Sequence, residues 1–460
     1  MKYETSRELA FEAYKKIVIN RGYSNLVLES MLEEAELSPR DKALAAKITY
    51  GTLQWQGYLD YYLDFLLKRP RAEIARDALF LLRLGAYQIL ILDKIPSRSA
   101  VDETVKLARK KMHRGIASLV NGTLRNLVRK YKEIELPDSE STPLEYLSVK
   151  YSHPSWMVEV WYHELGFERT ERLLKANNES PERTVRVNTL KTSRDEFVSE
   201  LASFGIAYEF VPQVLEGLII NNYEKLLETP FYHEGKYQPQ DINSMIVSLF
   251  VLPGANEKII DMCSAPGSKT THLAQLKKNK GKIIAVDINR AKLNRVHEAC
   301  KRMGINCVTP LLGDARRLFK DERLGKHEKE AFDACLVDAP CSGLGTLRRH
   351  PELKWTFKHD DITRLAKQQQ ELLVSAHKLL KPGGRLIYST CTISKRENQL
   401  TVSEFLKSYP GYKLEHPSDF IDQQAIQNAE INPDGLTQFY PGYGSGDGFF
   451  IARLKKPTRA

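Results

Sequence analysis

The sequence is poor in the features that mark secreted, membrane and zinc-binding proteins. It has six cysteines in 460 residues and no C-x-x-C pair, which disfavours a zinc finger and a disulfide scaffold. Its apolar runs are too short to span a bilayer. The charged opening Met1-Lys2-Tyr3-Glu4 does not have the pattern of a signal peptide. These absences predict a cytoplasmic protein with reduced thiols, no metal site and no membrane contact.

Two common phosphate-binding motifs are also missing. Gly267-Ser268-Lys269-Thr270 has part of a nucleoside triphosphate loop, but residue 268 is not glycine and no glycine lies five residues earlier. This argues against a nucleoside triphosphatase. No G-x-G-x-x-G fingerprint is present, which favours an adenosyl methyl donor over a nicotinamide cofactor.

Positive charge is concentrated near the N-terminus. The net charge is +10, and residues 1–132 contain 24 lysines and arginines against 15 acidic residues. Segment 106–132 has nine basic residues, among them Arg109, Lys110 and Lys111, and no acidic residue. A solvated helix face is the simpler interpretation. The missing acids favour a surface that binds nucleic acid, because no amphipathic membrane anchor accompanies the charge.

The chain is predicted to contain three domains of different fold class. Residues 1–135 have apolar side chains at helical spacing, and Ser38 before a proline is typical of a helix start. A polar segment with two prolines then predicts a linker. Residues 145–235 mix helix and strand patterns and predict a small α+β domain. Residues 236–456 alternate strand and helix, which predicts a Rossmann-like α/β domain.

The strands of the last domain are expected to form a parallel sheet with helices on both faces. A helix over about Asp361–Leu380 is expected to end at a Pro382-Gly383-Gly384 turn. The predicted strands are Lys258–Cys263, Lys282–Asp287, Val308–Leu312, Phe332–Asp338, Arg385–Cys391 and Phe449–Leu454.

Polar residues follow the predicted strand ends, which is where open α/β sheets bind ligands. Gly267 precedes a helix start with free N–H groups, although alone it could be only a tight turn. Asp287 comes twenty residues after that glycine, the usual spacing for a carboxylate that binds a ribose. Asp314 can accept a hydrogen bond from an adenine amino group. The full set at strand ends is Cys263, Asp287, Asp314, Asp338, Cys341 and Cys391.

Two of these cysteines suggest covalent catalysis. Cys341 stands in Asp-Ala-Pro-Cys-Ser-Gly and Cys391 in Tyr-Ser-Thr-Cys-Thr. Taken singly, each could be a small buried side chain, which is the interpretation for Cys300, Cys307 and Cys335. A thiolate that adds to C6 of cytosine makes C5 able to accept a methyl group. Asp338, if desolvation keeps it protonated, could engage ring N3.

At these motifs the chain resembles the RNA cytosine-5 methyltransferases that use S-adenosylmethionine, especially those acting on small-subunit rRNA. The motifs are Cys263 to Lys269, Asp287, Asp314, Asp338 to Gly343, Arg348 to Trp355, Ser389 to Cys391 and Gly446 to Phe450. The resemblance implies that Cys391 is the nucleophile and that Cys341 promotes product release. It implies that the methyl donor lies among Cys263, Ser264, Ala265, Pro266, Gly267, Ser268, Lys269, Asp287, Asp314 and Asp338.

The resemblance extends to the other two domains. Residues 1–135 resemble the helical RNA-binding domain of the NusB antitermination type, and the middle region resembles the family's small RNA-binding extension. One departure is visible, because the family often has alanine and glycine where this chain has Ser264 and Ser268. Serine suits a helix start, so cofactor binding is expected to survive.

The expected function is methylation of C5 of a cytosine in naked or partly assembled 16S (small-subunit) rRNA, by a monomer. The base is expected to be unpaired or flipped out of its stack. A tRNA substrate stays open. A DNA methyltransferase would use Cys341 as nucleophile, which leaves Cys391 unexplained. A non-catalytic RNA-binding assembly or antitermination factor would need neither thiol.

Overall fold

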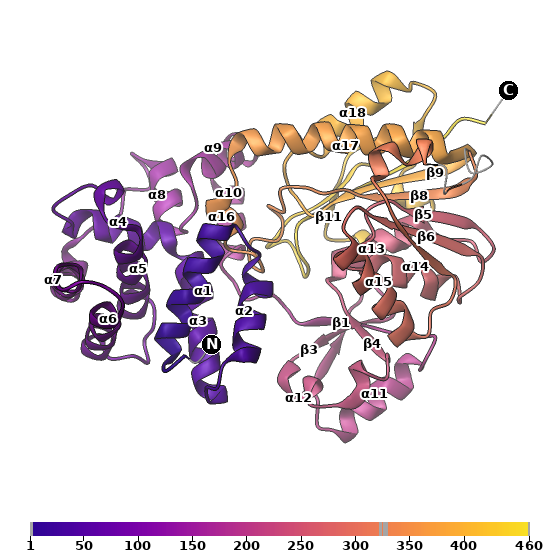
Figure 1. Cartoon of the computed structure of the whole chain (residues 1–460). Coiled ribbons are helices and arrows are strands. Elements are labelled where there is room, and N and C mark those ends of the chain that lie inside the picture. Colours follow the sequence, from indigo (N-terminus) through magenta and orange to yellow (C-terminus); the bar gives the residue numbers. More distant parts are fainter. Residues whose placement is uncertain (1–2, 322–323, 325–329, 459–460) are drawn as a thin grey trace. The chain divides into compact units, whose positions relative to one another are not determined.

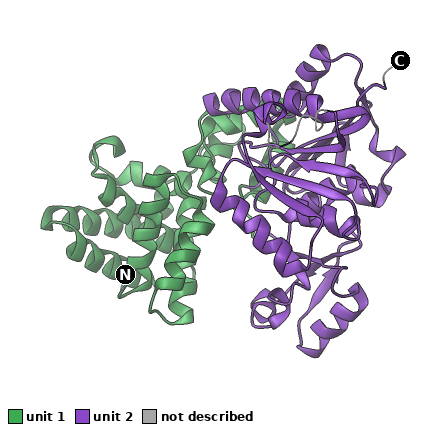
Figure 2. Cartoon of the chain, turned by 45° about the vertical axis from the view of Figure 1, so that its right-hand side comes forward, with its two compact units in different colours: residues 1–180, 347–358 green, residues 181–346, 359–460 purple. Residues whose placement is uncertain are grey.

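The computed structural model describes residues 3–321, 324 and 330–458. The chain divides into two compact units, coloured separately in Figure 2. Unit 1 comprises residues 1–180 and 347–358, and unit 2 comprises residues 181–346 and 359–460. Each unit therefore includes segments that are distant in the sequence.

Unit 1 is helical, as predicted for its N-terminal part. Asp41 donates its backbone N–H to the Ser38 hydroxyl over 3.2 Å, so Ser38 caps the helix that begins at Pro39. Apolar side chains that recur at helical spacing, such as Leu9 and Leu82, are fully buried in one core. The helices are α1 (Ser6–Asn20), α2 (Ser24–Glu34), α3 (Pro39–Gln54), α4 (Gln56–Leu66), α5 (Arg76–Leu90), α6 (Ser97–Lys111), α7 (Arg114–Lys130), α8 (Pro143–Lys150), α9 (Ser155–Leu165), α10 (Phe167–Ala176) and α16 (Leu353–Thr356).

A short segment from the C-terminal half completes unit 1. Residues 347–358 contain α16 and pack among the N-terminal helices. Lys354 is 1% exposed, and its ammonium donates to the carbonyls of Gln54 and Ser152 and to the side-chain oxygen of Asn178. Three acceptors match the three donors of an ammonium group, although burial lowers the pKa of this amine well below its ordinary value.

A small antiparallel sheet begins unit 2 and confirms the predicted α+β class. Its strands follow the order β2 (Tyr208–Phe210), β3 (Gly217–Ile220), β1 (Thr184–Val187) and β4 (Tyr237–Pro239). Helices α11 (Arg194–Ser203) and α12 (Tyr223–Leu227) accompany them. The last strand lies beyond residue 235, and the predicted domain limits stay predictions.

The larger sheet carries the Rossmann-like fold. Its order is β11-β12-β13-β9-β8-β5-β6-β7, with β10 also paired to β13. The strands are β5 (Lys258–Asp261), β6 (Lys282–Asp287), β7 (Val308–Leu312), β8 (Phe332–Asp338), β9 (Leu380–Thr390), β10 (Lys413–Leu414), β11 (Ala429–Ile431), β12 (Thr437–Phe439) and β13 (Phe449–Lys455). Strands β7, β6, β5, β8 and β9 are parallel, as predicted.

The predicted parallel sheet is antiparallel at one edge. Strand β13 runs antiparallel to both β9 and β12, and β11 is antiparallel to β12. Alternation of apolar residues locates a strand but carries no information about its direction. The connection 440–448 between β12 and β13 is too short for a parallel crossover, so these strands must be antiparallel.

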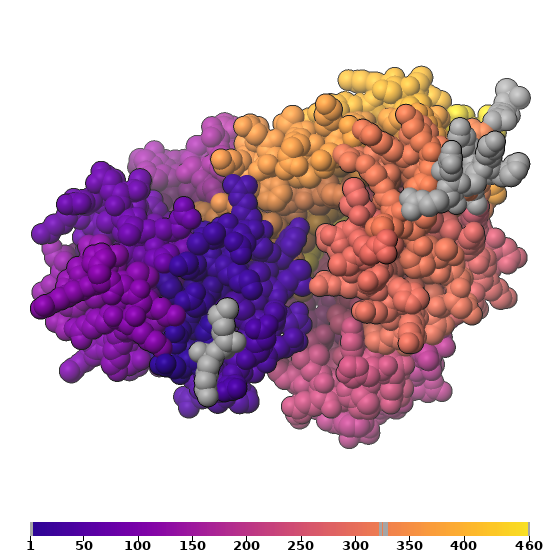
Figure 3. Space-filling view, viewed as in Figure 1, coloured from indigo at the N-terminus to yellow at the C-terminus, as the bar shows by residue number. Residues whose placement is uncertain are grey.

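Helices cover both faces of the larger sheet (Figure 1). On one face, α13 (Ile242–Val251), α14 (Ser268–Leu276) and α15 (Arg290–Met303) pack on Ile259 and Ile283. On the other, α17 (His359–Leu379) and α18 (Gln399–Ser408) pack on Ile260 and Ile284. Successive residues of a strand face opposite sides, which explains this division. Figure 3 shows α17 and α18, orange to yellow, on the surface of the unit.

The predicted Pro382-Gly383-Gly384 turn is instead part of strand β9. Phe332 pairs with Leu380, whereas Ala334, only two residues further along β8, pairs with Arg385. The turn residues therefore form an irregularity within the strand, and Gly383 has a positive φ of 72°. Tertiary pairing with β8 overrides the local turn preference.

Candidate functional site

A cavity of about 300 Å³ lies where strands β5, β6 and β7 end. Three predicted cofactor residues, Cys263, Asp287 and Asp314, line it, so the tertiary structure brings together side chains spread over 52 positions. The cavity is also lined by Met262, Ile288, Lys292, Gly313, Ala315, Arg316, Pro340, Gln368 and Leu372. The position agrees with the rule that ligands bind beyond the carboxyl ends of parallel strands.

The two predicted carboxylates are held in different ways. Asp287 accepts the backbone N–H of Asn289 over 2.8 Å. Asp314 accepts two hydrogen bonds from the guanidinium of Arg316, at 2.9 and 2.7 Å, and this contact lowers the pKa of its carboxyl group. The sequence analysis did not predict a role for Arg316. Its position two residues after Asp314, at a strand end, could have indicated a partner for that acid. Both carboxylates are thus held by hydrogen bonds from residues two positions further along the chain.

The turn between β5 and α14 is built as the sequence suggested. Gly267 has a φ of 108° and precedes the first helical residue, Ser268. A Cβ on this glycine would lie 3.2 Å from Cα of Val296, so the residue is restricted by backbone shape and by packing. Ser264 donates two hydrogen bonds to the carbonyl of Val286, one from its hydroxyl and one from its backbone N–H. The serine thus ties the turn to β6.

Lys269 and Asp338 form an ion pair beside this turn. The ammonium of Lys269 lies 2.8 Å from one carboxyl oxygen of Asp338, and the hydroxyl of Ser389 donates to the other over 2.7 Å. Burial opposes charge on Lys269, but Asp338 raises the pKa of its amine above the ordinary value. The sequence placed Lys269 in the cofactor turn but did not predict its ion pair with Asp338.

The two cysteines meet at the ends of β8 and β9. Sγ of Cys341 lies 3.3 Å from Sγ of Cys391, although fifty residues separate them. The hydrogen bond with Cys391, followed by burial, raises the pKa of Cys341 well above its usual value. Cys341 is therefore held as a thiol that can donate to the sulfur of Cys391. Pro340, next to Cys341, also lines the cavity.

Asp261 is a buried acid that the sequence did not single out. It is 1% exposed at the end of β5 and accepts the hydroxyl of Thr270 over 2.7 Å. Burial raises the pKa of its carboxyl to about 7, and the charge of Asp338 adds to the rise. Asp261 ends strand β5 two residues before the predicted cofactor turn. That position in the sequence could have marked it as a candidate site residue.

Arg186 on β1 joins the small sheet to α14. It is fully buried and donates to the Ser268 carbonyl, the Thr271 hydroxyl and the Gln275 amide oxygen over 2.9 to 3.1 Å. Burial lowers the pKa of its guanidinium to about 9. The sequence predicted the strand but not this contact. The small domain therefore supports the helix whose start forms the predicted cofactor turn.

The predicted basic surface is partly neutralised. Lys110 forms ion pairs with Glu4 and Glu8, and Lys111 with Glu8 and Glu12, all within 3.2 Å. Arg109 and Arg125 instead line an open hollow of about 450 Å³ between α6 and α7. Within the described part of the chain, these two arginines form no ion pair. They, rather than the neighbouring lysines, remain available to a polyanion.

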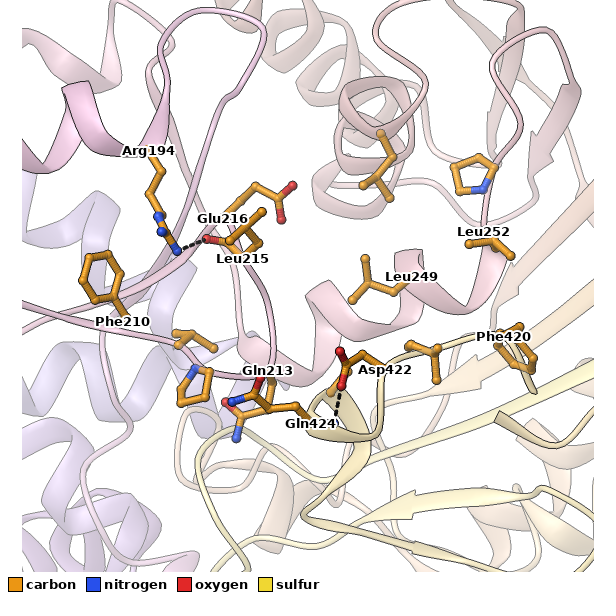
Figure 4. Close-up of a pocket in the computed structure, with 16 residues that line it drawn as sticks. Arg194, Phe210, Gln213, Leu215, Glu216, Leu249, Leu252, Phe420, Asp422 and Gln424 are labelled. Carbon is orange, nitrogen blue, oxygen red and sulfur yellow. Dashed lines mark hydrogen bonds between the residues drawn. The ribbon is translucent and has the colours of Figure 1, made fainter. Parts of the chain in front are cut away.

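A larger cavity, of about 710 Å³, lies elsewhere in unit 2 (Figure 4). Its wall is mostly apolar and includes Phe210, Leu215, Leu249 and Phe420. None of the predicted site residues lines it. Three of the predicted cofactor residues therefore line the smaller of these two cavities.

Models of three known families match successive parts of the chain. Residues 4–129 match the NusB family, and residues 153–225 match the ferredoxin-like domain of RsmF/B-like methyltransferases. Residues 248–455 match the 16S rRNA methyltransferase RsmB/F family. A Bacillus subtilis (strain 168) protein, named probable ribosomal RNA small subunit methyltransferase B, is 36% identical over 99% of this chain and 100% of its own length.

The chain belongs to the ribosomal RNA small subunit methyltransferase B family. The enzyme of that name from Klebsiella pneumoniae (strain 342) is 32% identical over 98% of both chains. The predicted family is confirmed.

Solved structures agree with this membership. A methyltransferase homolog from Pyrococcus horikoshii has a TM-score of 0.59 at 27% identity, covering 69% of this chain and 99% of its own. NSun6 from the same organism, solved with the cofactor analogue SFG, has a TM-score of 0.57 at 27% identity, covering 65% of this chain and 97% of its own.

The family's cofactor is S-adenosylmethionine, as predicted. The residues present fit it, because Asp287 and Asp314 lie at or just after the ends of two adjacent strands and line one cavity together with Cys263, which lies in the turn before α14. Among the described helices, none combines the length and apolar character needed to cross a membrane.

Proposed function

We propose that this member of the methyltransferase B family methylates C5 of a cytosine in small-subunit rRNA through a covalent adduct with Cys391. The 3.3 Å approach of Cys341 and Cys391 carries the proposal. Two thiols at adjacent strand ends, beside the cofactor cavity, suit nucleophilic addition and later elimination. The names of the relatives support rRNA as the substrate.

The residues divide the cofactor and base sites between them. Asp287 and Asp314 would hold the ribose and adenine of S-adenosylmethionine, and the turn from Cys263 to Lys269 would hold its amino acid end. When bound, the cofactor supplies an electrophilic methyl group. Lys269 of this turn forms an ion pair with Asp338, which lies three residues before Cys341 in the chain, so the pair can position the base and stabilise charge on it.

The proposed reaction has a defined order for the two sulfurs. The Cys391 thiolate adds to C6, and C5 then takes the methyl group. The C5 proton is lost to solvent or a base, and the bond between Cys391 and C6 breaks. Cys341 keeps its proton and donates a hydrogen bond to the Cys391 sulfur, which stabilises the thiolate before attack and again as it leaves.

The proposal predicts opposite effects for two alanine variants. Cys391→Ala should abolish transfer, because no nucleophile remains. Cys341→Ala should accumulate a covalent protein–RNA adduct, because the departing sulfur has lost its hydrogen-bond donor. Denaturing gels with labelled RNA measure the adduct. An adduct in Cys391→Ala and none in Cys341→Ala would reverse the two roles.

The substrate is tested by labelled-methyl transfer to unmethylated small-subunit rRNA, tRNA and duplex DNA, with the modified nucleoside identified. 5-Methylcytidine in rRNA alone supports the proposal. Label in tRNA or DNA would keep the chemistry and replace the substrate. No transfer by protein that binds S-adenosylmethionine would favour a non-catalytic RNA-binding factor.

A further inference from the structure

Three buried polar side chains surround the cysteine pair and have no part in the mechanism above. They are Gln369 on α17 and the neighbours Glu397 and Asn398, which precede α18. Each is 0% exposed. Burying an amide or a carboxyl group is costly unless it is hydrogen-bonded, so the partners of these groups indicate what they are for.

The first set of contacts fixes both neighbours of Cys341. The amide of Gln369 donates to the carbonyl of Pro340 over 3.0 Å. Glu397 accepts the backbone N–H of Ser342 over 2.8 Å, and the Ser342 hydroxyl also donates to its carboxylate. The backbone on each side of Cys341 is thus held by a buried side chain from another element.

The second set fixes both neighbours of Cys391 in the same way. Thr390 donates its hydroxyl to the side-chain oxygen of Asn398 over 2.6 Å. The amide of Asn398 donates to the carbonyl of Thr392 over 2.9 Å. Each cysteine loop is thus tied to a buried side chain of another element.

The two sets are connected to each other. Gln369 donates to Glu397 over 3.1 Å, and Asn398 follows Glu397 in the chain. The hydroxyls of Ser342 and Thr392, each one residue after a cysteine, lie 2.8 Å apart. One buried network therefore fixes both loops. Glu397 contacts the Cys341 loop directly, is joined to Gln369, and precedes Asn398, which contacts the Cys391 loop.

We propose that Glu397 is a positioning residue for the two thiols, which it holds at hydrogen-bonding distance together with Gln369 and Asn398. The role of the thiols rests on the function proposed above, whereas the positioning does not. In the family reaction, a loosened pair would let the Cys341 donor drift from the sulfur of Cys391. A shift of about 1 Å in a reacting group can cost up to about a hundredfold in rate.

The electrostatics agree with this geometry. Burial raises the pKa of Glu397, although hydrogen bonds from Ser342, Gln369 and Thr392 oppose the rise. The carboxyl group in turn helps to raise the pKa of Cys341, after the larger effects of the Cys391 contact and of burial. Glu397 therefore favours the thiol form of Cys341 as well as its position.

The positioning is tested without catalysis by phenylarsine oxide, which releases water as its arsenic bonds to two adjacent thiols. Wild type should keep the arsenic reagent bound when a competing monothiol is added. Cys341→Ser, which has only one of the two thiols, should release it. Glu397→Gln should weaken retention by about tenfold or more, because a less constrained pair has a lower effective concentration. Glu404→Gln, the same change on a half-exposed acid of α18, should retain it as wild type does.

Steady-state methyl transfer gives a second readout. Glu397→Gln should lower kcat with little change in KM for S-adenosylmethionine, because the cofactor cavity is untouched. Gln369→Leu, which removes two of the same hydrogen bonds and no charge, keeps the test valid if Glu397→Gln fails to fold. Wild-type reagent retention in both folded variants would overturn the proposal. Weakened retention with no transfer by wild type would leave the positioning standing and remove the proposed function.

Discussion

At the scale of single residues, Asp261 makes stability depend on pH in an unusual direction. Its carboxyl pKa rises from 3.8 to about 7 because the group is buried. The folded state therefore keeps a proton that the unfolded chain releases between these values. The stabilisation of the folded state by this bound proton is complete below about pH 3.8. It is lost as the pH rises through about 7.

Asp261→Asn should remove this dependence. The amide cannot ionise, so between pH 4 and 8 wild type should lose up to about 4 kcal/mol relative to the variant, at about 1.4 kcal/mol per pKa unit. Urea unfolding of unit 2 without cofactor measures the difference. Asp333→Asn is the control, since Lys381 holds the pKa of that carboxyl below its usual value despite partial burial. The difference in unfolding free energy between Asp333→Asn and wild type should change only at acidic pH. If the unfolding free energies of Asp261→Asn and wild type depend on pH in the same way, the raised pKa of Asp261 is refuted.

At the scale of elements, helix α6 separates two kinds of basic residue. Lys110 and Lys111 face α1 and form ion pairs with its acids, whereas Arg109 faces the hollow shared with Arg125 on α7. The segment 106–132 has no acid of its own, so the sequence could not show that α1 supplies them. Net charge near a surface is therefore a poor measure of the charge available to RNA.

A pair of double variants with the same change in net charge tests this division. Arg109→Gln with Arg125→Gln should weaken binding to a small-subunit rRNA fragment. It should also reduce the slope of log affinity against log salt by about 1 to 2, because each lost phosphate contact releases fewer counterions. Lys110→Gln with Lys111→Gln should lower helix stability more than RNA affinity. Equal losses of affinity would mean that only total charge matters. Filter binding over a salt series measures both.

At the scale of the whole molecule, the chain leaves unit 2 six residues after Cys341 and returns after residue 358. The excursion is held within unit 1 by buried polar groups. Glu352 accepts both the N–H and the hydroxyl of Ser24, and Lys354 donates to three oxygens. The motif from Arg348 to Trp355 thus completes the core of unit 1 instead of lining the cofactor cavity.

Lys354→Met should destabilise unit 1 selectively. Methionine fills a similar volume, but three buried oxygens lose their donor, which should cost about 2 to 4 kcal/mol. Hydrogen exchange should rise in α3 and near residues 152 and 178, while S-adenosylmethionine binding by unit 2 stays unchanged. Lys367→Met, on the exposed side of α17, should alter neither. A uniform rise in exchange over both units would mean that they unfold together.

The sequence by itself determined the fold classes, most strand positions and the edge of the sheet where the chemistry-bearing residues gather. Apolar alternation and strand-end polarity are local patterns, so β6, β7 and β8 could be located to the residue. The family motifs added the cofactor. None of this required knowledge of which strands are neighbours.

Only the tertiary structure decided the contacts between residues distant in the chain. It paired Lys269 with Asp338, joined Arg186 to α14, and placed Glu397 against the Cys341 loop. It also reversed β13, because strand direction depends on connections rather than on alternation. Hydrogen bonds and ion pairs act over about 3 Å, and a sequence shows no distances between residues that are far apart along the chain.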